Sequence, residues 1–338
     1  MRAIVWRGER EYRLEDVPDP VAAPGQVIVQ IAATAICGSD LHLKEFGAPH
    51  PIIPGHEGCG VVVDAGDSPS DLNVGDRVTL NPVQTCGECY CCTHGMEHLC
   101  LRTRHLGSGP VPGTWAERVA VDAANAHVIP DSLSFEAAAM TEPVAVCYES
   151  YQRSGTPRDA SVLVIGDGPF GFLHARLATA LGARTVVCAG HYDERLARIA
   201  EHTGAVVCNT RREDLSEVIR TTIGPDRPGV DIAIEASGSG AAPSIGLRAL
   251  RPRGTMVIFS SVWDPEPLAM WELHMRELTI VAACRSLHAF EPCLELMADG
   301  MVDTEQLIDL SVPMADFRNA FHRLSADKAH YFKAVLRP

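Results

Sequence analysis

Residues 161–171 read SVLVIGDGPFG, an apolar run followed by a glycine-rich turn, and they are the strongest indication of the fold class in the sequence. The apolar run Ser161–Ile165 predicts a short buried strand, and the turn after it opens an apolar helix that reaches about Leu181. The turn has the spacing G-x-G-x-x-G, which in this context is typical of a dinucleotide-binding site. Its first glycine allows the tight turn, the second lets a pyrophosphate approach the backbone, and the third lets the helix pack on the strand. Phosphate would lie at the helix N-terminus, where amide groups are unpaired. The predicted cofactor-binding residues here are Gly166, Gly168, Pro169, Phe170 and Gly171.

Strands and helices alternate regularly from this stretch onward. Helices are expected at Asp193–Thr203, with Asp193 as its cap, and near 213–223 and 241–250. The expected strands are Ser161–Ile165, Thr185–Ala189, Ala205–Cys208, Val230–Glu235, Thr255–Ser260 and Leu278–Ala283. This alternation predicts an α/β fold with a doubly wound parallel sheet.

The two ends of the chain do not show this regular alternation of strands and helices. The first 130 residues read as short strands broken by prolines, among them Val27–Ile31 and Gly60–Val63. The last part carries helical segments near 289–300 and 314–325 and a strand at Phe332–Leu336. We expect this tail to pack back onto the β-rich first part.

Length and charge limit the classes of function. A chain of 338 residues is long enough for about two domains. A net charge of −14 argues against nucleic acid and anionic membranes as partners. No apolar run approaches the roughly 18 residues of a membrane helix, and the start lacks a signal-peptide pattern. We therefore expect a cytoplasmic protein, in which 12 cysteines indicate metal binding or catalysis rather than disulfides.

Four cysteines in one short segment follow the spacing C-x2-C-x2-C-x7-C. Thiolates in such a cluster suit a closed tetrahedral zinc site with a structural role. Free or redox-active cysteines and an iron–sulfur cluster are the alternatives. The four residues are Cys86, Cys89, Cys92 and Cys100.

A second, open metal site is indicated upstream. A catalytic zinc ion needs about three protein ligands and one free position. Cys37 and His56 supply a thiolate and an imidazole from separate segments, and Glu142 or Glu57 would complete the set. By itself this pattern is weak, because isolated residues of these types are most often structural.

The end of the second predicted strand bears on cofactor choice. NAD sites carry an acid there that bonds the adenine ribose, but this sequence has Gly190. Without that carboxylate a 2′-phosphate is not repelled, and His191 and Arg195 would supply donors and positive charge. We therefore favour NADP over NAD. In the alternative interpretation, Arg195 is a solvated helix residue and an acid elsewhere, such as Asp193, binds the adenine ribose.

Taken together, these motifs resemble the zinc-dependent medium-chain dehydrogenase/reductase superfamily over essentially the whole chain. The likeness is closest to its polyol branch, which includes sorbitol and threonine dehydrogenases. It is carried by CGSDLH at 37–42, PGHEGCGVV at 54–62, the cysteine quartet, EPVAV at 142–146 and GDGPFG at 166–171.

The resemblance implies two zinc ions per chain, one catalytic and one structural. It implies that Cys37, His56 and Glu142 hold the catalytic zinc and that Glu57 holds its water or exchanges onto the metal. Ser39 would take the substrate proton, and His42 would relay it to solvent. Hydride would pass between the alcohol carbon and the nicotinamide.

The resemblance also implies the domain plan and the assembly. A GroES-like catalytic domain would comprise residues 1–147 and 285–338, and a Rossmann cofactor domain residues 148–284. A homodimer or homotetramer is expected. Phe46, Trp115 and Trp263 are candidates for the lining of the substrate pocket, with a place in the core as the alternative.

The predicted function is zinc-dependent hydride transfer between a small-molecule alcohol or ketone and NAD(P). The polyol branch favours a secondary alcohol, such as a polyol, a cyclitol or an amino alcohol. A simple alcohol or aldehyde dehydrogenase is the alternative within the superfamily. A non-catalytic NADPH-binding protein is the alternative of another class, and the retention of Cys37, Ser39, His56, Glu57 and Glu142 argues against it.

Overall fold

The computed structural model describes residues 1–9, 11–43, 45, 47–48, 50–67, 70–109, 111–155, 157–286 and 288–338. The chain forms two compact units, one from Met1–Ala145 with Arg285–Pro338 and the other from Val146–Cys284. Within the described residues, no helix is long and apolar enough to cross a membrane.

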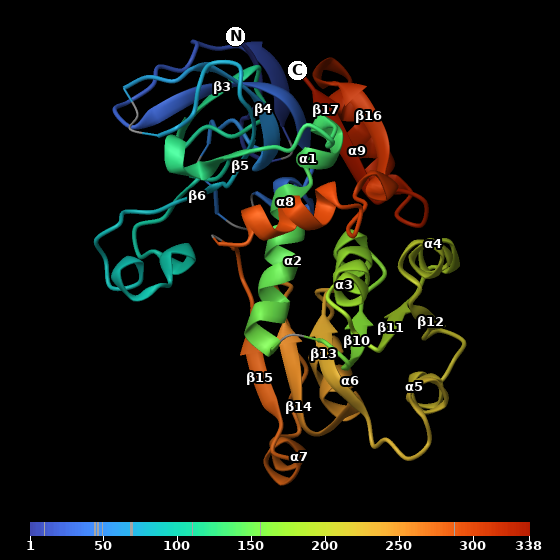
Figure 1. Ribbon diagram of the computed structural model, residues 1–338. Coiled ribbons are helices and arrows are strands. Elements are labelled where there is room, and N and C mark those ends of the chain that lie inside the picture. Colours follow the sequence, from blue (N-terminus) through green and yellow to red (C-terminus); the bar gives the residue numbers. More distant parts are fainter. Residues whose placement is uncertain are drawn as a thin grey trace. The chain divides into compact units, whose positions relative to one another are not determined.

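The second unit is built on a six-stranded sheet in which every neighbouring pair is parallel (Figure 1). The strand order is β12-β11-β10-β13-β14-β15. The strands are β10 (Ser161–Ile165), β11 (Thr185–Gly190), β12 (Val206–Asn209), β13 (Val230–Glu235), β14 (Leu250–Ile258) and β15 (Thr279–Ala282). The predicted doubly wound sheet is confirmed, and the strand order reverses between β10 and β13, where such folds bind their ligands.

Helices connect these strands. They are α3 (Pro169–Ala180), α4 (Asp193–Thr203), α5 (Leu215–Ile223), α6 (Ala242–Ala249) and α7 (Met270–Met275). A core cluster that includes Leu163, Val187 and Met256 is buried in this unit. The predicted cap of α4 is wrong, because Asp193 is the first helical residue and Tyr192 precedes the helix. The Asp193 carboxylate instead accepts hydrogen bonds from Asn209, at 2.6 Å, and from Arg212, at 2.5 Å.

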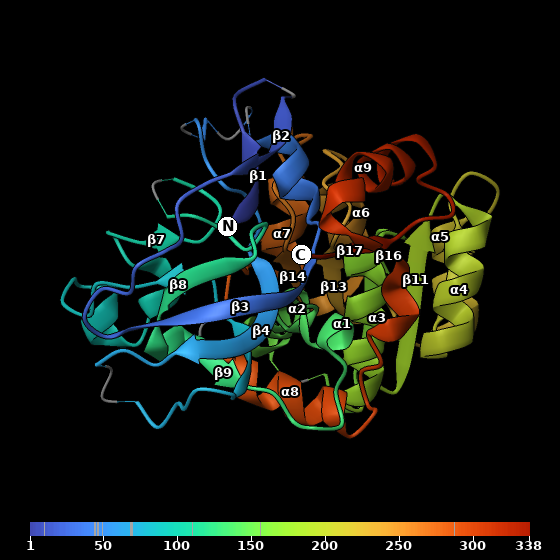
Figure 2. The ribbon, with the colours of Figure 1, turned by 90° about the horizontal axis from the view of Figure 1, so that it is seen from above.

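The first unit contains a seven-stranded sheet that joins the two ends of the chain (Figure 2). Its path is β16-β17-β3-β4-β5-β9, and β8 also pairs with β3. The strands are β3 (Gln26–Ala35), β4 (Glu57–Asp64), β5 (Arg77–Leu80), β8 (Arg118–Asp122), β9 (Ala126–Val128), β16 (Ile308–Pro313) and β17 (Lys333–Arg337). Val335 lies opposite Ala35, so the tail packs back onto the first part as predicted.

Smaller elements complete the first unit. Two hairpins pair β1 (Arg2–Trp6) with β2 (Tyr12–Asp16) and β6 (Val83–Gln84) with β7 (Arg104–His105). The remaining helices are α1 (Phe135–Ala138), α2 (Thr141–Ser154), α8 (Phe290–Ala298) and α9 (Phe317–Ala326). Of these, α2 begins in the first unit and ends in the second.

Among the described residues, two apolar clusters contribute to the core of the first unit. One gathers Trp6, Trp115 and Leu336, and the other gathers inward-facing residues of β3 and its neighbours, including Val29 and Val62. Trp115 is therefore a core residue and not part of a pocket lining. Trp263 is 72% exposed, and Phe46 lies outside the described residues.

Candidate functional site

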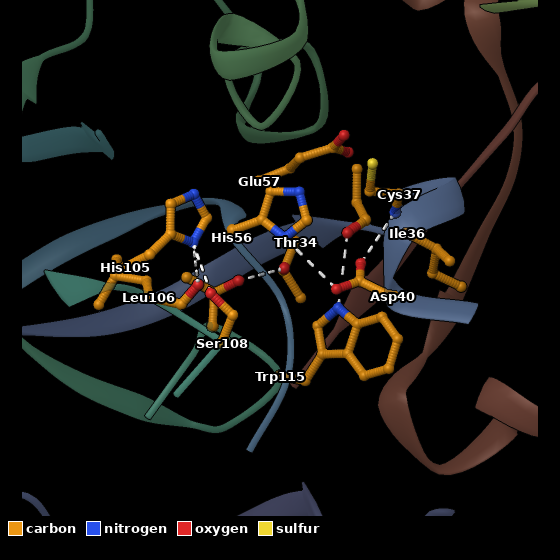
Figure 3. Close-up of polar contacts among 12 residues, drawn as sticks. Thr34, Ile36, Cys37, Asp40, His56, Glu57, His105, Leu106, Ser108 and Trp115 are labelled. Atoms are coloured by element: carbon orange, nitrogen blue, oxygen red, sulfur yellow. Dashed lines mark hydrogen bonds and ion pairs between the residues drawn. The ribbon is translucent and has the colours of Figure 1, made fainter. Parts of the chain in front are cut away.

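The pairing of β3 with β4 builds a cluster of metal-binding side chains. Ala35 lies opposite Glu57, so Cys37, two residues beyond Ala35, comes beside His56 and Glu57. The sulfur of Cys37, a ring nitrogen of His56 and a carboxylate oxygen of Glu57 lie within 4.8 Å of one another (Figure 3). Thiolate, imidazole and carboxylate are the ligand types that zinc takes in catalytic sites, so the donor set fits this ion.

Asp40 holds two members of this cluster in place. It sits in the short 3-10 turn Gly38–His42, is 1% exposed, and accepts a hydrogen bond from the Cys37 backbone N–H at 3.0 Å. Its other oxygen lies 3.3 Å from Nδ1 of His56. Burial would lower the pKa of His56, but Asp40 outweighs this effect and raises it well above its usual range. The contact leaves Nε2 of His56 as the nitrogen that can bind a metal.

Gly55 is required for the approach of His56 to this cluster. Its φ of +89° is unfavourable for a side chain, and a Cβ added there would lie 2.2 Å from Cδ1 of Trp115. Trp115 is fully buried, so it cannot yield. The glycine before His56 therefore lets the chain pass over the Trp115 ring.

Lys333 forms a buried ion pair with Glu57. Its Nζ lies 2.6 and 2.5 Å from the two carboxylate oxygens and donates to the Ile36 carbonyl at 3.2 Å. The side chains are 3% and 0% exposed. Burial would lower the pKa of Lys333, but the negative charge of Glu57 raises it. Removing one partner of such a pair would leave an uncompensated buried charge.

Glu142, the other predicted third ligand, lies in the first turn of α2. Its carboxylate is not part of the 4.8 Å group formed by Cys37, His56 and Glu57 among the described residues. Burial raises the pKa of Glu142 to about 7, and the charges of His56 and Lys333 oppose this rise. The structure therefore places Glu142 within electrostatic reach of the cluster.

The two predicted proton-transfer residues lie on the turn that follows Cys37. Ser39 is partly exposed. The His42 side chain is 63% exposed, and its Nδ1 lies 3.8 Å from a carboxylate oxygen of Glu45.

His105, at the end of β7, lies next to His56. It was not predicted as a site residue from the sequence. The two ring centroids are 5.5 Å apart. Nδ1 of His105 lies 2.8 Å from the Leu106 carbonyl oxygen and 3.2 Å from Oγ of Ser108. Burial, and then the charge of His56, lower the pKa of His105 to about 3.

The four cysteines of the predicted structural site converge on one point. They lie in a loop whose only regular elements, among the described residues, are the 3-10 turns Cys92–His94 and Glu97–Leu99. The sulfur of Cys86 lies 3.9 Å from that of Cys92 and 3.5 Å from that of Cys100. The sulfur of Cys89 lies 3.5 and 3.8 Å from the same two atoms. Four sulfurs around a tetrahedral zinc, with bonds of about 2.3 Å, would be about 3.8 Å apart, so the geometry fits.

The remaining cysteines are not part of either group. Cys91 lies outside the quartet. Cysteines at 59, 147, 188 and 208 are buried, as expected for small apolar residues. Cys284 is exposed, because it follows the edge strand β15.

The glycine turn after β10 has the shape that a pyrophosphate requires. Gly166 has a φ of +136°, and a Cβ on Gly171 would lie 1.9 Å from the Gly166 carbonyl oxygen. A Cβ on Gly168 would meet only Nη1 of Arg195, at 3.9 Å. Gly168 caps α3 without a side-chain hydrogen bond, and Pro169 starts the helix. The turn therefore leaves open space and backbone amides at the helix N-terminus, which fits a dinucleotide phosphate.

An acid from the glycine turn fills the space next to Gly190. A Cβ on Gly190 would lie 2.4 Å from Cβ of Asp167. Oδ2 of Asp167 accepts hydrogen bonds from the backbone N–H groups of His191, at 2.6 Å, and Tyr192, at 2.8 Å. The absence of an acid at position 190 is thus coupled to the presence of one at position 167, which sequence reasoning missed.

Arginines surround the turn between β11 and α4. The guanidinium groups of Arg195 and Arg211 lie 5.5 and 5.4 Å from the centre of the Tyr192 ring. Nη1 of Arg195 lies 4.0 Å from Oδ1 of Asp167, and His191 is exposed nearby. The predicted residues Gly190, His191 and Arg195 are thus together, and Arg211, from the loop after β12, joins them.

Family models match parts of both units of the chain. Residues 23–131 match the family model "Alcohol dehydrogenase GroES-like domain", and residues 169–299 match "Zinc-binding dehydrogenase". The sorbitol dehydrogenase of Bacillus subtilis is 31% identical over 345 aligned residues, which cover 100% of this chain and 97% of the relative.

Solved structures with both cofactor types are similar to this chain. A putative zinc-binding dehydrogenase from Sinorhizobium meliloti 1021 bound to NADP has a TM-score of 0.90 and 28% identity, with 100% and 99% of the two chains covered. An alcohol dehydrogenase from Escherichia coli CFT073 complexed with NADH has a TM-score of 0.92 and 26% identity, with the same coverage.

Proposed function

The chain belongs to the zinc-dependent medium-chain alcohol dehydrogenases, and from this premise we propose that it oxidises a polyol or reduces the corresponding ketone. It is an oxidoreductase that transfers hydride between a secondary alcohol or ketone and a nicotinamide cofactor. The observation that carries the proposal is the convergence of Cys37, His56 and Glu57 in a cluster braced by Asp40 and Lys333. The likeness to a sorbitol dehydrogenase supports the polyol class.

In this proposal Cys37, His56 and Glu142 hold the catalytic zinc ion. A zinc ion bound there supplies a Lewis acid for the oxygen of an alcohol or carbonyl group. We assign the third ligand to Glu142 rather than Glu57, because both oxygens of Glu57 are engaged by Lys333. Glu57 then lies beside the ligands as a compensated charge.

Ser39 and His42 provide the proton path. Ser39 is partly exposed two residues after Cys37, where its hydroxyl can accept a proton from a substrate bound at the cluster while it passes its own proton on toward His42. His42 ends the same 3-10 turn and is open to solvent, so it can release the proton to water.

We assign the structural zinc ion to Cys86, Cys89, Cys92 and Cys100. Hydrogen bonds from the backbone at Glu88 and Cys89 help to lower the pKa of Cys86 to about 6, which favours the thiolate form that binds metal. The sulfur–sulfur distances of 3.5 to 3.9 Å support this assignment.

The cofactor domain is assigned to the second unit, and NADP is the proposed cofactor. The carboxylate of Asp167 is bonded to two backbone N–H groups and lies near Arg195, so its charge is compensated. Arg195, Arg211 and His191 then offer positive charge and donors to a 2′-phosphate.

The test of cofactor choice uses fragments of the cofactor. Arg211→Ala should weaken binding of 2′,5′-ADP about tenfold and leave 5′-AMP binding unchanged, because only the first carries the 2′-phosphate. Calorimetric titration of both fragments measures this. Equal affinities of the wild-type protein for the two fragments would contradict the NADP assignment.

The test of the activity is a screen with both nicotinamide cofactors over polyols, cyclitols, amino alcohols and simple primary alcohols. We expect turnover of a secondary alcohol, and loss of turnover in Glu142→Gln together with the loss of one zinc ion per chain. Retention of that zinc in Glu142→Gln but not in Glu57→Gln would reverse the assignment of the third ligand.

We also propose a homodimer that forms through the edge strand β15. Ile280 on this strand is a large apolar residue that is 38% exposed, and the outer edge of β15 pairs with no other strand in the described part of the chain. On α7, Met270, Trp271 and Met275 are 65%, 73% and 59% exposed. Apolar side chains grouped on one region are typical of an interface.

A further inference from the structure

The side chain of His105 offers a hydrogen-bonding atom beside the proposed zinc ligands that the mechanism above does not use. A carbonyl oxygen can only accept a hydrogen bond, so the contact between Nδ1 of His105 and the Leu106 carbonyl, at 2.8 Å, requires the proton on Nδ1. A neutral imidazole protonated at Nδ1 presents a lone pair at Nε2. The local backbone therefore fixes both the tautomer and the orientation of this ring.

The free edge of the ring faces the site. Figure 3 shows Nδ1 of His105 turned to Leu106 and Ser108, and the opposite ring nitrogen turned to the side on which the sulfur of Cys37 and the carboxylate of Glu57 lie. Nε2 of His56, which is left for the metal, points to that side as well. The centroids of the two imidazoles are 5.5 Å apart, so the two rings are neighbours at the site.

We infer that His105 is a specificity-determining residue, whose Nε2 accepts a hydrogen bond from a hydroxyl group on the carbon next to the one that is oxidised. This inference rests on the proposed function, and it narrows the substrate class to vicinal diols. A simple secondary alcohol has no second hydroxyl on the adjacent carbon, so Nε2 of His105 would lie against its apolar chain without a hydrogen bond. A site built to bond a substrate hydroxyl discriminates strongly against an analogue that lacks it.

The test compares butane-2,3-diol, in its separate stereoisomers, with butan-2-ol, which has the same chain and one hydroxyl. His105→Leu removes the acceptor, and His105→Gln keeps an acceptor oxygen at a similar reach. In His105→Leu we expect kcat/KM for the diol to fall about tenfold and that for butan-2-ol to change less than about twofold. In His105→Gln, much of the diol activity should return. Zinc content and circular dichroism of both variants should equal those of the wild-type protein.

Calorimetric titration of the diol into protein without nicotinamide gives a readout that needs no turnover. We expect the wild-type protein and His105→Gln to bind the diol and His105→Leu to bind it about tenfold more weakly. Equal losses on diol and mono-alcohol would show a merely structural role and overturn the inference, as would diol kinetics and binding that do not depend on His105. If the wild-type protein oxidises secondary alcohols but neither its activity on the diol nor its binding of the diol depends on His105, the inference fails and the proposed function stands. If it oxidises no secondary alcohol with either nicotinamide cofactor, the proposed function fails and the inference fails with it.

Discussion

At the scale of single residues, the proposed metal site depends on groups that would not themselves touch the metal. Asp40 bonds the Cys37 backbone and faces Nδ1 of His56, and Lys333 neutralises Glu57. Asp40 lies inside the motif CGSDLH at 37–42, which the sequence analysis singles out. Its burial and its contact with His56 could not be predicted from the motif. Lys333 was beyond prediction, because it is 276 positions from Glu57 and no local pattern links them.

Replacement of Asp40 by asparagine should weaken zinc binding at the catalytic site. The carboxylate orients His56 and increases the basicity of its ring, and loss of such a partner typically costs 10- to 100-fold in metal affinity. Competition with a chelator, followed by metal analysis, measures the change. Asp71→Asn, at an exposed position, is the matched control and should retain both zinc ions.

His174 is a buried histidine whose ring nitrogens make no hydrogen bond within the described residues. It is fully buried in α3 against Phe259. Burial lowers the pKa of His174 to about 3. In the unfolded chain its pKa is about 6.5, so below that pH the unfolded state binds more protons and stability falls.

The variant His174→Leu should therefore be more stable than the wild-type protein, and more so in acid. The gain at pH 7.5 should be about 1–3 kcal/mol, from removal of an unsatisfied buried polar group. At pH 5.5 it should be larger by about 1.4 kcal/mol, because the unfolded wild-type chain gains a proton there. Urea unfolding at the two pH values measures both numbers. A gain that is the same at pH 5.5 and 7.5 would contradict the neutral buried state of His174.

At the scale of elements, the central sheet was predictable and much of the first unit was not. Strands of a parallel sheet are buried on both faces, so they read as continuous apolar runs, and β10 and β13 were placed to the residue. Short or mixed elements such as β1, β2 and β16 carry no such signal. Helix α2 carries Pro143 in its first turn, where proline is well tolerated.

The turn between β11 and α4 shows why cofactor choice was harder to predict than the fold. The absence of an acid at position 190 was visible in the sequence. The role of the acid at position 167 was not visible, because Asp167 accepts its hydrogen bonds from His191 and Tyr192, which are 24 and 25 residues further along the chain. Arg211 likewise reaches Tyr192 from the next loop.

The cysteine loop is the element with the clearest metal dependence. It has few backbone hydrogen bonds of regular structure, so its order should come from the metal that its four sulfurs hold. We expect Cys89→Ser to lose one zinc ion per chain and to become sensitive to protease between residues 86 and 100. Cys91→Ser, in the same loop but outside the quartet, should keep the metal and the resistance. Identical digestion patterns in the two variants would argue against a structural zinc.

At the scale of the whole molecule, the exposed edge of the sheet in the second unit predicts self-association. Replacing Ile280 by lysine places a charge on the β15 edge, a device that natural proteins use against edge pairing. Light scattering after size-exclusion chromatography should show a dimer or larger assembly for the wild-type protein and a smaller species for Ile280→Lys. Val206→Lys, on the opposite edge strand β12, is the control and should leave the mass unchanged. A monomeric wild-type protein would contradict the proposed interface.

The most direct test of the central claim, an open zinc site at Cys37 and His56 in addition to the closed cysteine site, is the zinc content per chain. Metal analysis of the purified wild-type protein should give two zinc ions per chain. Cys37→Ser should give one, with turnover almost lost and the fold retained by circular dichroism, while Cys284→Ser, at an exposed cysteine outside both sites, should give two. A wild-type protein with one zinc or none, or a Cys37→Ser variant with two zinc ions and near-normal activity, would contradict the account.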